Sequence, residues 1–149
     1  YDLATSHVLP ALIRKAHEAK CAGAADLEIW GTGTPRRDFL YSDDLADACM
    51  FVLTRSPDVV ADLFSEEHAP LINIGSWEEV SIRDLADQVR GVVGCTGELV
   101  WDASKPDGTP RKWVDMERLR ALGWSATTPL AEGLISVYQD FLERYYKSA

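Results

Sequence analysis

The chain has 149 residues, 46% of them apolar and 26% charged, with 24 acidic residues against 15 basic ones and a formal net charge of −9. This length suits one domain with a real core, or one piece of a larger protein. No apolar run approaches the roughly 20 residues of a membrane span, and no basic start followed by an apolar core marks a signal peptide. The acidic balance disfavours nucleic-acid binding, so we expect neither a membrane nor a nucleic-acid partner.

The cysteines and histidines disfavour two further kinds of site. Three cysteines form an odd set without CxxC spacing, which argues against a disulfide framework and against a cysteine-type zinc site. The three histidines lie far apart in the sequence, so no metal site is expected. Reduced thiols and a cytoplasmic location are the simplest interpretation. The cysteines fall within or at the ends of apolar helices, which predicts buried or unreactive thiols at Cys21, Cys49 and Cys95.

The first 41 residues predict a helix followed by two extended pieces. Ser6 is a possible N-cap and Pro10 fits a first turn, so the helix is expected from about His7 to Cys21. The sequence GAAD ends this helix. Residues 27–30, LEIW, are typical of a short strand, and residues 36–41, RRDFLY, of a second extended piece after a GTGTP turn.

A second helix is expected over residues 43–55, with Ser42 as its N-cap. Asp43 and Asp44 fall in the first turn, where carboxylates are favourable, and we interpret them as capping groups rather than a catalytic pair. Residues 56–70 form a polar connection with little pattern. The expected apolar stripe of the helix consists of Leu45, Ala48, Cys49, Val52 and Leu53.

The remainder of the chain continues to alternate strands and helices, without a fixed repeat. This order places the chain in the α/β class, as helices around a small mixed sheet. The expected elements are a strand at 70–75, a helix at 81–94 capped by Ser81 and ended near Gly94, a strand at 97–103, a short helix at 115–124 ended by Gly123, and a last helix at 129–147.

Cations gather on the loop WDASKPDGTPRKW, although the protein is acidic. Lys105, Arg111 and Lys112 stand on this loop, which Pro106 and Pro110 stiffen. Two further basic pairs occur in the segments LIRK and PRRD. Arginine offers a planar fork for phosphate oxygens and lysine a point charge, so converging pairs would form an anion pocket. The alternative is that each pair is a solvated surface patch.

His7 and Trp30 are two further candidates. The positive end of a helix disfavours the imidazolium form, which would suit His7 to acid–base chemistry, although a histidine at a helix start more often caps or packs. Trp30 precedes a glycine turn and could stack on a base or a sugar, or close the core. The turn itself lacks the third glycine and the following helix of a dinucleotide fingerprint.

Taken together and in order, five segments resemble the C-terminal half of the GDP-L-fucose synthase family, a branch of the extended short-chain dehydrogenases/reductases. The resemblance covers essentially the whole chain, and the first and fourth segments are the specific ones. The segments are SHVLPALIRKAHEAK, WGTGTPRRDFLYSDDLADA, NIG, DASKPDGTPRKW and LGW.

The resemblance implies an enzyme that epimerises GDP-4-keto-6-deoxy-D-mannose at C3 and C5 and reduces C4 with NADPH, giving GDP-L-fucose. It assigns His7 as an acid in the epimerisation that also lies near the nicotinamide. It assigns contacts with the GDP-sugar to Lys15, Trp30, Arg37 and Asp107, with Lys105 and Arg111 as additional diphosphate contacts.

The resemblance also implies what this chain lacks. The family's glycine-rich cofactor loop, its Tyr-xxx-Lys pair and its epimerising cysteine belong to an N-terminal NADP-binding Rossmann domain that is absent here. Residues 1–149 are therefore expected to be the substrate-binding portion alone, inactive by itself, with NADP(H) bound mainly by the missing half. Self-association is expected, because loss of that domain should expose Met50 and Phe51. The alternatives are another nucleotide-sugar epimerase or dehydratase of the superfamily, or a noncatalytic nucleotide-sugar-binding module.

Overall fold

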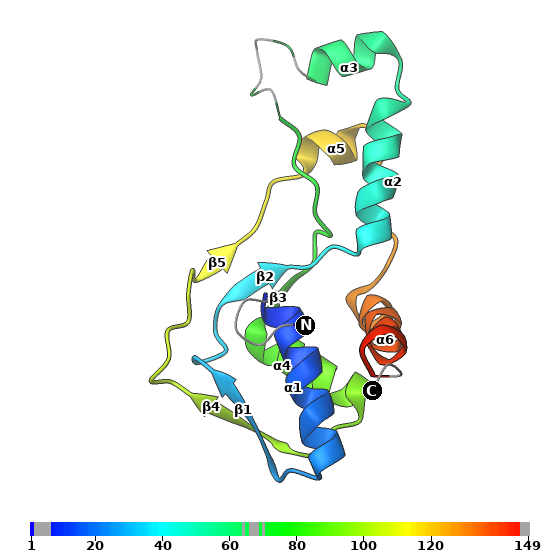
Figure 1. Ribbon diagram of the computed structural model, residues 1–149. Coiled ribbons are helices and arrows are strands. Elements are labelled where there is room, and N and C mark those ends of the chain that lie inside the picture. The colour runs from blue at the N-terminus through cyan, green and yellow to red at the C-terminus, as the bar shows by residue number, and fades with distance from the viewer. Residues whose placement is uncertain (2–6, 64, 66–68, 70, 147–149) are drawn as a thin grey trace. The chain divides into compact units, whose positions relative to one another are not determined.

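The computed structural model describes residues 1, 7–63, 65, 69 and 71–146 (Figure 1). They form two compact units, each assembled from segments that are distant in the sequence. Residues 1–37, 80–111 and 131–149 make up the first unit, and residues 38–79 and 112–130 the second. Every residue to which the sequence assigned a catalytic or binding role belongs to the first unit.

The first unit contains a pair of parallel strands, β1 at Asp26–Trp30 and β4 at Glu98–Asp102. Their register places Trp30 opposite Asp102, so both strands end at the same edge. Alternate residues of β1 are buried, as the two-residue period of a strand requires. Loops that follow the two strands therefore leave the sheet side by side.

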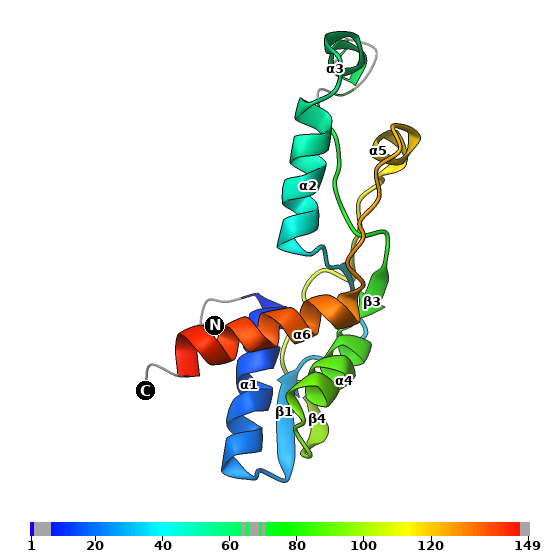
Figure 2. The same cartoon turned by 90° about the vertical axis from the view of Figure 1, so that its right-hand side faces the viewer.

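Helices supply most of the core of the first unit. Helix α1 contacts both β1 and α4 (Figure 2). The helices are α1 at Val8–Ala22, α4 at Ile82–Val93, α6 at Leu130–Phe141 and the π-helical turn η1 at Leu142–Tyr146. The buried side chains of this unit include Leu12, Ile13, Ala16, Leu27, Ile29, Leu85, Val89, Val93, Leu134 and Phe141.

The ends of α1 and α4 are formed as the sequence predicts at three of four places. Gly23 and Gly94 end the two helices in the left-handed conformation that glycine adopts without strain. Ser81 caps α4 by accepting a hydrogen bond from the amide of Asp84. The fourth end differs, because His7 is the N-cap residue of α1 and its side chain makes no capping hydrogen bond. Ser6, the expected cap, lies outside the described residues.

Three short strands lie where the chain passes between the units. They are β2 at Arg36–Asp38, β3 at Glu79–Ser81 and β5 at Arg111–Lys112, paired in the order β3-β2-β5. Strand β2 is shorter than the predicted extended piece, and β3 and β5 were not predicted. The expectation of an α/β chain with helices and small sheets is confirmed.

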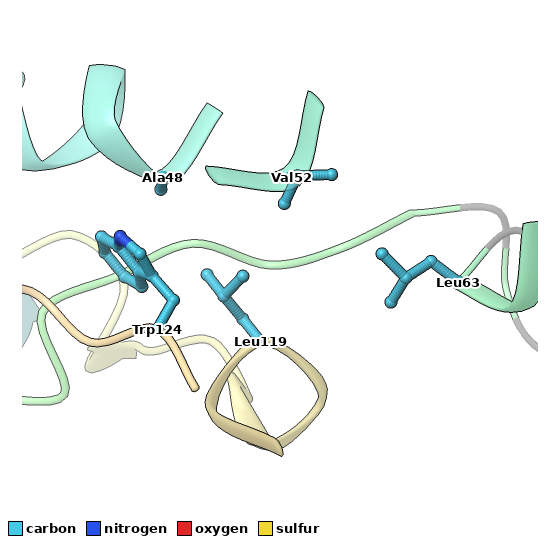
Figure 3. Packing of buried hydrophobic residues seen from close by; sticks show 5 residues of the cluster. All are labelled: Ala48, Val52, Leu63, Leu119 and Trp124. Carbon is cyan, nitrogen blue, oxygen red and sulfur yellow. The ribbon is translucent and has the colours of Figure 1, made fainter. Parts of the chain in front are cut away.

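The second unit is helical, with α2 at Ser42–Leu53, α3 at Pro57–Leu63 and α5 at Glu117–Ala121. Five side chains from these helices and from the segment after α5 form its core (Figure 3). They are Ala48, Val52, Leu63, Leu119 and Trp124. The indole nitrogen of Trp124 donates to Asp47 at 2.8 Å, so the polar edge of this ring is satisfied.

Two of the expected elements in the second unit are wrong. The described residues 71–75 form no strand; Ile72 and Ile74 instead pack against the core, which accounts for their alternation without any partner strand. The polar connection that follows α2 contains α3, whose Pro57 occupies the first turn, where proline is tolerated.

Helix α2 buries a narrower face than the predicted stripe. Asp44, Ala48 and Val52 are buried at intervals of four residues, whereas Leu45, Cys49 and Leu53 are exposed. Tyr41, not Ser42, is the N-cap residue. Asp44 does not cap its own helix either, since it accepts hydrogen bonds from Thr127 and Thr128, as described below.

The thiols are distributed differently from the prediction. Cys95 is buried, but Cys21 and Cys49 are exposed. In the described part of the chain no three His, Cys, Asp or Glu side chains are grouped so that they could hold a metal ion. Among the described helices, none has both the length and the apolar character needed to cross a bilayer.

Candidate functional site

Trp30 lies at the centre of a cationic cluster in the first unit. Its side chain is 59% exposed, because Leu27 and Ile29 take the inward positions of β1. The Nζ atoms of Lys15 and Lys105 lie 5.3 and 5.5 Å from the centroid of the indole. Ammonium groups at this distance are attracted to the face of an indole ring. Trp30 is therefore a surface platform rather than the core residue that was the alternative.

The two lysines reach Trp30 from different parts of the chain. Lys15 stands in the middle of α1, and its Nζ also donates to the carbonyl of Glu28 at 3.3 Å. Lys105 belongs to the loop after β4, which turns back because the amides of Gly31 and Lys105 both donate to the carbonyl of Asp102, at 2.9 and 3.2 Å. The sequence left open whether the basic pairs converge or form separate surface patches, and the structure brings Lys15 and Lys105 to one ring.

Asp107 joins the loop after β4 to the turn after β1. Its Oδ1 accepts from the amide of Thr32 at 2.6 Å, and its Oδ2 accepts from the hydroxyl of the same residue at 2.8 Å. These hydrogen bonds, the backbone one foremost, hold the pKa of the Asp107 carboxyl below its ordinary value. Each oxygen thus already has a donor from the protein before any ligand arrives.

The turn after β1 is shaped to receive Asp107. Gly31 has a φ of +87°, and a Cβ atom there would lie 2.3 Å from Oδ1 of Asp107. Any other residue would have to displace the carboxylate and would also adopt a backbone conformation that L residues rarely take. The glycine of WGTG is therefore required by the loop contact, for a reason that the sequence did not reveal.

Arg37 brings a third cation toward the same loop. Its Nη1 donates to the carbonyl of Arg36 at 2.7 Å, and its Nη2 lies 4.0 Å from the place that a Cβ of Gly108 would occupy. The amide of Arg36 donates to the carbonyl of Pro110 at 2.9 Å, which fixes β2 against the end of the loop. Arg111 follows immediately, exposed, on β5.

Arg83 is a further cation at this place, and the sequence reasoning missed it. Its Nη2 donates to the carbonyl of Thr32 at 2.7 Å, and its guanidinium lies 4.4 Å from the centroid of Trp101. The residue lies in the first turn of α4, a position that carries no motif, so the sequence offered no signal for it. It supports the same turn that Asp107 holds.

His7 stands apart from this cluster along α1. Its side chain is exposed, and its carbonyl accepts from the amide of Ala11 at 3.2 Å. Eight residues separate it from Lys15, which corresponds to about 12 Å along a helix axis. The structure does not bring His7 and the lysine pair together.

The turn after β1 does not fit the pyrophosphate of a dinucleotide cofactor. A Rossmann site needs a glycine turn that leads into a helix, with open space for a pyrophosphate. The turn here leads into β2, and the places of a Cβ at Gly31 and Gly33 are taken by Asp107 and by the indole of Trp101. This turn is therefore not a dinucleotide-binding loop.

Comparisons with known proteins show what the chain is similar to. Residues 1–65 match the model of the NAD dependent epimerase/dehydratase family. The chain is 51% identical to GDP-L-fucose synthase 1 of Arabidopsis thaliana over 138 residues, which is 93% of this chain and 40% of that protein. The chain thus spans about two fifths of the length of such relatives.

Two solved structures have a similar fold over almost the whole chain. A GDP-L-fucose synthetase from Naegleria fowleri bound to NADP superposes with a TM-score of 0.78 at 28% identity, over 97% of this chain and 43% of that one. A GDP-mannoheptose C4 reductase from Campylobacter jejuni with NADP bound gives 0.75 at 35% identity, over 93% and 46%. The chain is therefore similar, over almost its whole length, to part of the GDP-L-fucose synthases, as the five sequence segments predicted, and its first 65 residues match the NAD dependent epimerase/dehydratase family.

Proposed function

We propose that this chain is the substrate-binding portion of an enzyme that converts GDP-4-keto-6-deoxy-D-mannose to GDP-L-fucose. The observation that carries the proposal is the cationic cluster around Trp30, which combines an exposed aromatic face with the ammonium groups of Lys15 and Lys105. A nucleoside diphosphate has the matching parts, a flat base and two negative phosphates. The names of the relatives indicate that the nucleotide is GDP and that it carries a sugar.

In this proposal the cations share one role, and Trp30 and Asp107 have others. Lys15, Lys105 and Arg37 neutralise the diphosphate, with Arg111 as an additional contact from β5. Trp30 stacks on a flat part of the nucleotide. Asp107 orients the loop through Thr32 and offers its remaining lone pairs to donor groups of the ligand.

Helix α1 would place the sugar away from the phosphates. His7 lies about 12 Å from Lys15 along the helix axis, a spacing suited to a ligand with its nucleotide at one end and its reacting sugar at the other. Protons on the carbons beside the C4 ketone are acidic because the carbanion is delocalised into the carbonyl. A base in the rest of the polypeptide would remove the proton from C3 or C5, and His7 would return a proton to the same carbon from the opposite face, which inverts that centre.

The reductive step is assigned to the rest of a longer polypeptide, where NADP(H) would bind. We therefore expect the 149-residue chain to show no NADPH-dependent reduction of the keto sugar. The measurement is the loss of NADPH absorbance against a no-protein control. Turnover above that control would contradict the assignment of the cofactor site.

A second candidate is a GDP-sugar C4 reductase that does not epimerise. It is favoured by the similarity to the Campylobacter protein named for that reaction. The two candidates differ in proton exchange. In a full-length protein that contains this chain, deuterium from the solvent would enter C3 and C5 of the product only if epimerisation occurs.

The first experiment is a calorimetric titration of the chain with GDP, and with UDP as the control. We expect GDP to bind and UDP to bind more weakly.

Replacing Trp30 with alanine should weaken GDP binding about 5- to 100-fold, the range expected for one aromatic stacking contact. Lys105→Ala should also weaken it, whereas Arg144→Ala removes an equal charge from an exposed pair with Asp140 and should not. Equal binding of GDP and UDP would reduce the site to a general anion pocket.

A further inference from the structure

The second unit contains a cavity of about 190 Å³ that the proposed function does not use. Its floor is made of three buried side chains, Met116, Leu119 and Trp124. The Nε1 atom of Trp124 is occupied by Asp47, which leaves the apolar part of this indole to line the space. A dry cavity of about 150 Å³ in another protein accepts a benzene molecule, so this volume suits one ring.

The wall of the cavity carries Trp77, and its backbone is unusual. Trp77 has a φ of +71°, the left-handed region that residues with a Cβ rarely occupy. The turn is held there by Asp38, whose carboxylate accepts from both the amide and the hydroxyl of Ser76. The Ser76 hydroxyl also accepts from the amide of Glu78 at 3.0 Å. The turn is thus fixed on both sides, and Trp77 remains 41% exposed at the cavity.

Arg120 supplies a positive charge at the same wall. Its guanidinium carbon lies 4.7 Å from the centroid of Trp77. Within the described ranges no carboxylate lies at ion-pair distance from Arg120. A guanidinium stacked on an indole keeps its in-plane donors available for a carboxylate, because stacking uses only its face. The carboxylate of Asp38, in the same unit, accepts from Ser76.

We propose that this cavity is a binding site for a small ring compound that carries one carboxylate. The ring would rest on Met116, Leu119 and Trp124, with the exposed indole of Trp77 along its side. The carboxylate would pair with Arg120. The volume accommodates a single ring, and the uncompensated charge of Arg120 selects an anion in a protein of net charge −9.

The test uses three ring probes of similar size: benzoate, benzyl alcohol and benzamidine. Each is titrated into the 149-residue chain, and binding is followed by the backbone amide and indole N–H signals of the ¹H–¹⁵N spectrum. We expect benzoate to shift the signals of Trp77, Arg120 and Trp124, and to bind at least about tenfold more tightly than benzyl alcohol. Benzamidine should bind least, since Arg120 repels it.

Two variants separate the charge from the cavity. Arg120→Gln should bring benzoate down to the affinity of benzyl alcohol and leave benzyl alcohol unchanged. Ala126→Leu, which fills the lined space, should abolish the binding of both. Arg55→Gln is the matched control, because it removes a stacked arginine from the same unit at Phe51 and away from the cavity lining.

Three outcomes would overturn the proposal. They are equal binding of benzoate and benzamidine, signal shifts that map outside the cavity, or no binding of benzoate at the highest concentration that leaves the spectrum intact. An oligomer that Ala126→Leu converts to a monomer would show that a side chain of another copy fills the cavity instead. Because the chemical shifts locate the ligand directly, an unstable Ala126→Leu variant would still leave the proposal testable.

Discussion

Asp107 holds the loop after β4 against the turn after β1, whether or not a ligand is bound. Both of its oxygens accept from Thr32, and Gly31 leaves the room that the carboxylate needs. The sequence identified Asp107 through the resemblance of its KPDG motif. It did not identify Thr32 as the partner, because the contact joins residues that are 75 positions apart.

This contact predicts an acid-sensitive contribution of Asp107 to stability. The folded pKa of Asp107 lies below its ordinary value of 3.8, so its contribution is present above that pH and is lost as the pH falls through the folded pKa. We expect Asp107→Asn to unfold at a lower temperature than the wild type at about pH 7, and this difference to shrink below about pH 4. The measurement is thermal unfolding across that range.

Asp58→Asn is the control for that series, since Asp58 is an exposed aspartate in the other unit. At about pH 7 its unfolding temperature should fall less than that of Asp107→Asn, because Asp58 does not join two loops. A gap between Asp107→Asn and the wild type that stayed constant down to about pH 3 would mean that the charge of Asp107 is not what joins the loops.

At the scale of elements, α2 is held at its start by a buried carboxylate. Asp44 accepts from the amide and hydroxyl of Thr127 at 3.2 and 2.9 Å and from the amide of Thr128 at 3.0 Å. Burial acts to raise the pKa of Asp44, but these hydrogen bonds outweigh it and lower the pKa. The carboxylate joins α2 to the segment before α6 within the second unit.

Removing this carboxylate should leave two amides without a partner. We expect Asp44→Ala to lower the free energy of unfolding by about 2–3 kcal/mol, because hydrogen bonds to a buried charge are lost. Asp43→Ala removes the neighbouring exposed carboxylate of the same turn, and it should cost less than about 1 kcal/mol. Urea unfolding followed by circular dichroism measures both, and equal losses would contradict the role of Asp44.

The elements also show what the sequence can and cannot predict. Three of the four ends of α1 and α4 were predictable because a glycine or a serine acts locally on its own helix. The exposure of Trp30 was predictable from the alternation of β1, since Leu27 and Ile29 occupy the inward positions. The face of α2 could not be read in this way, because Asp44 is buried by distant threonines. Arg83 was missed because its contact is also distant in the sequence, with the carbonyl of Thr32.

On the scale of the whole molecule, exposed apolar side chains on α2 predict self-association. Met50 is 59% exposed and Leu53 is 76% exposed. The expectation for Phe51 is wrong, because that ring is half-buried at the core of the second unit and Arg55 lies on it at 3.6 Å. Apolar side chains grouped on one exposed face favour contact between molecules.

We expect the mean mass in light scattering to rise with protein concentration. Leu53→Lys should reduce this rise, because it places a charge in the exposed face of α2. Leu71→Lys, at another exposed leucine of the same unit, should have little effect. A strictly monomeric wild type at high concentration would contradict the prediction.

The two exposed thiols have a practical consequence for spectroscopy. Cys21 lies in the first unit and Cys49 in the second, and Cys95 is buried. A thiol-reactive nitroxide should therefore attach at two positions without any engineered cysteine, one in each unit. Dipolar spectroscopy on the doubly labelled chain would then report the distribution of distances between the units. Adding GDP would show whether a nucleotide narrows that distribution.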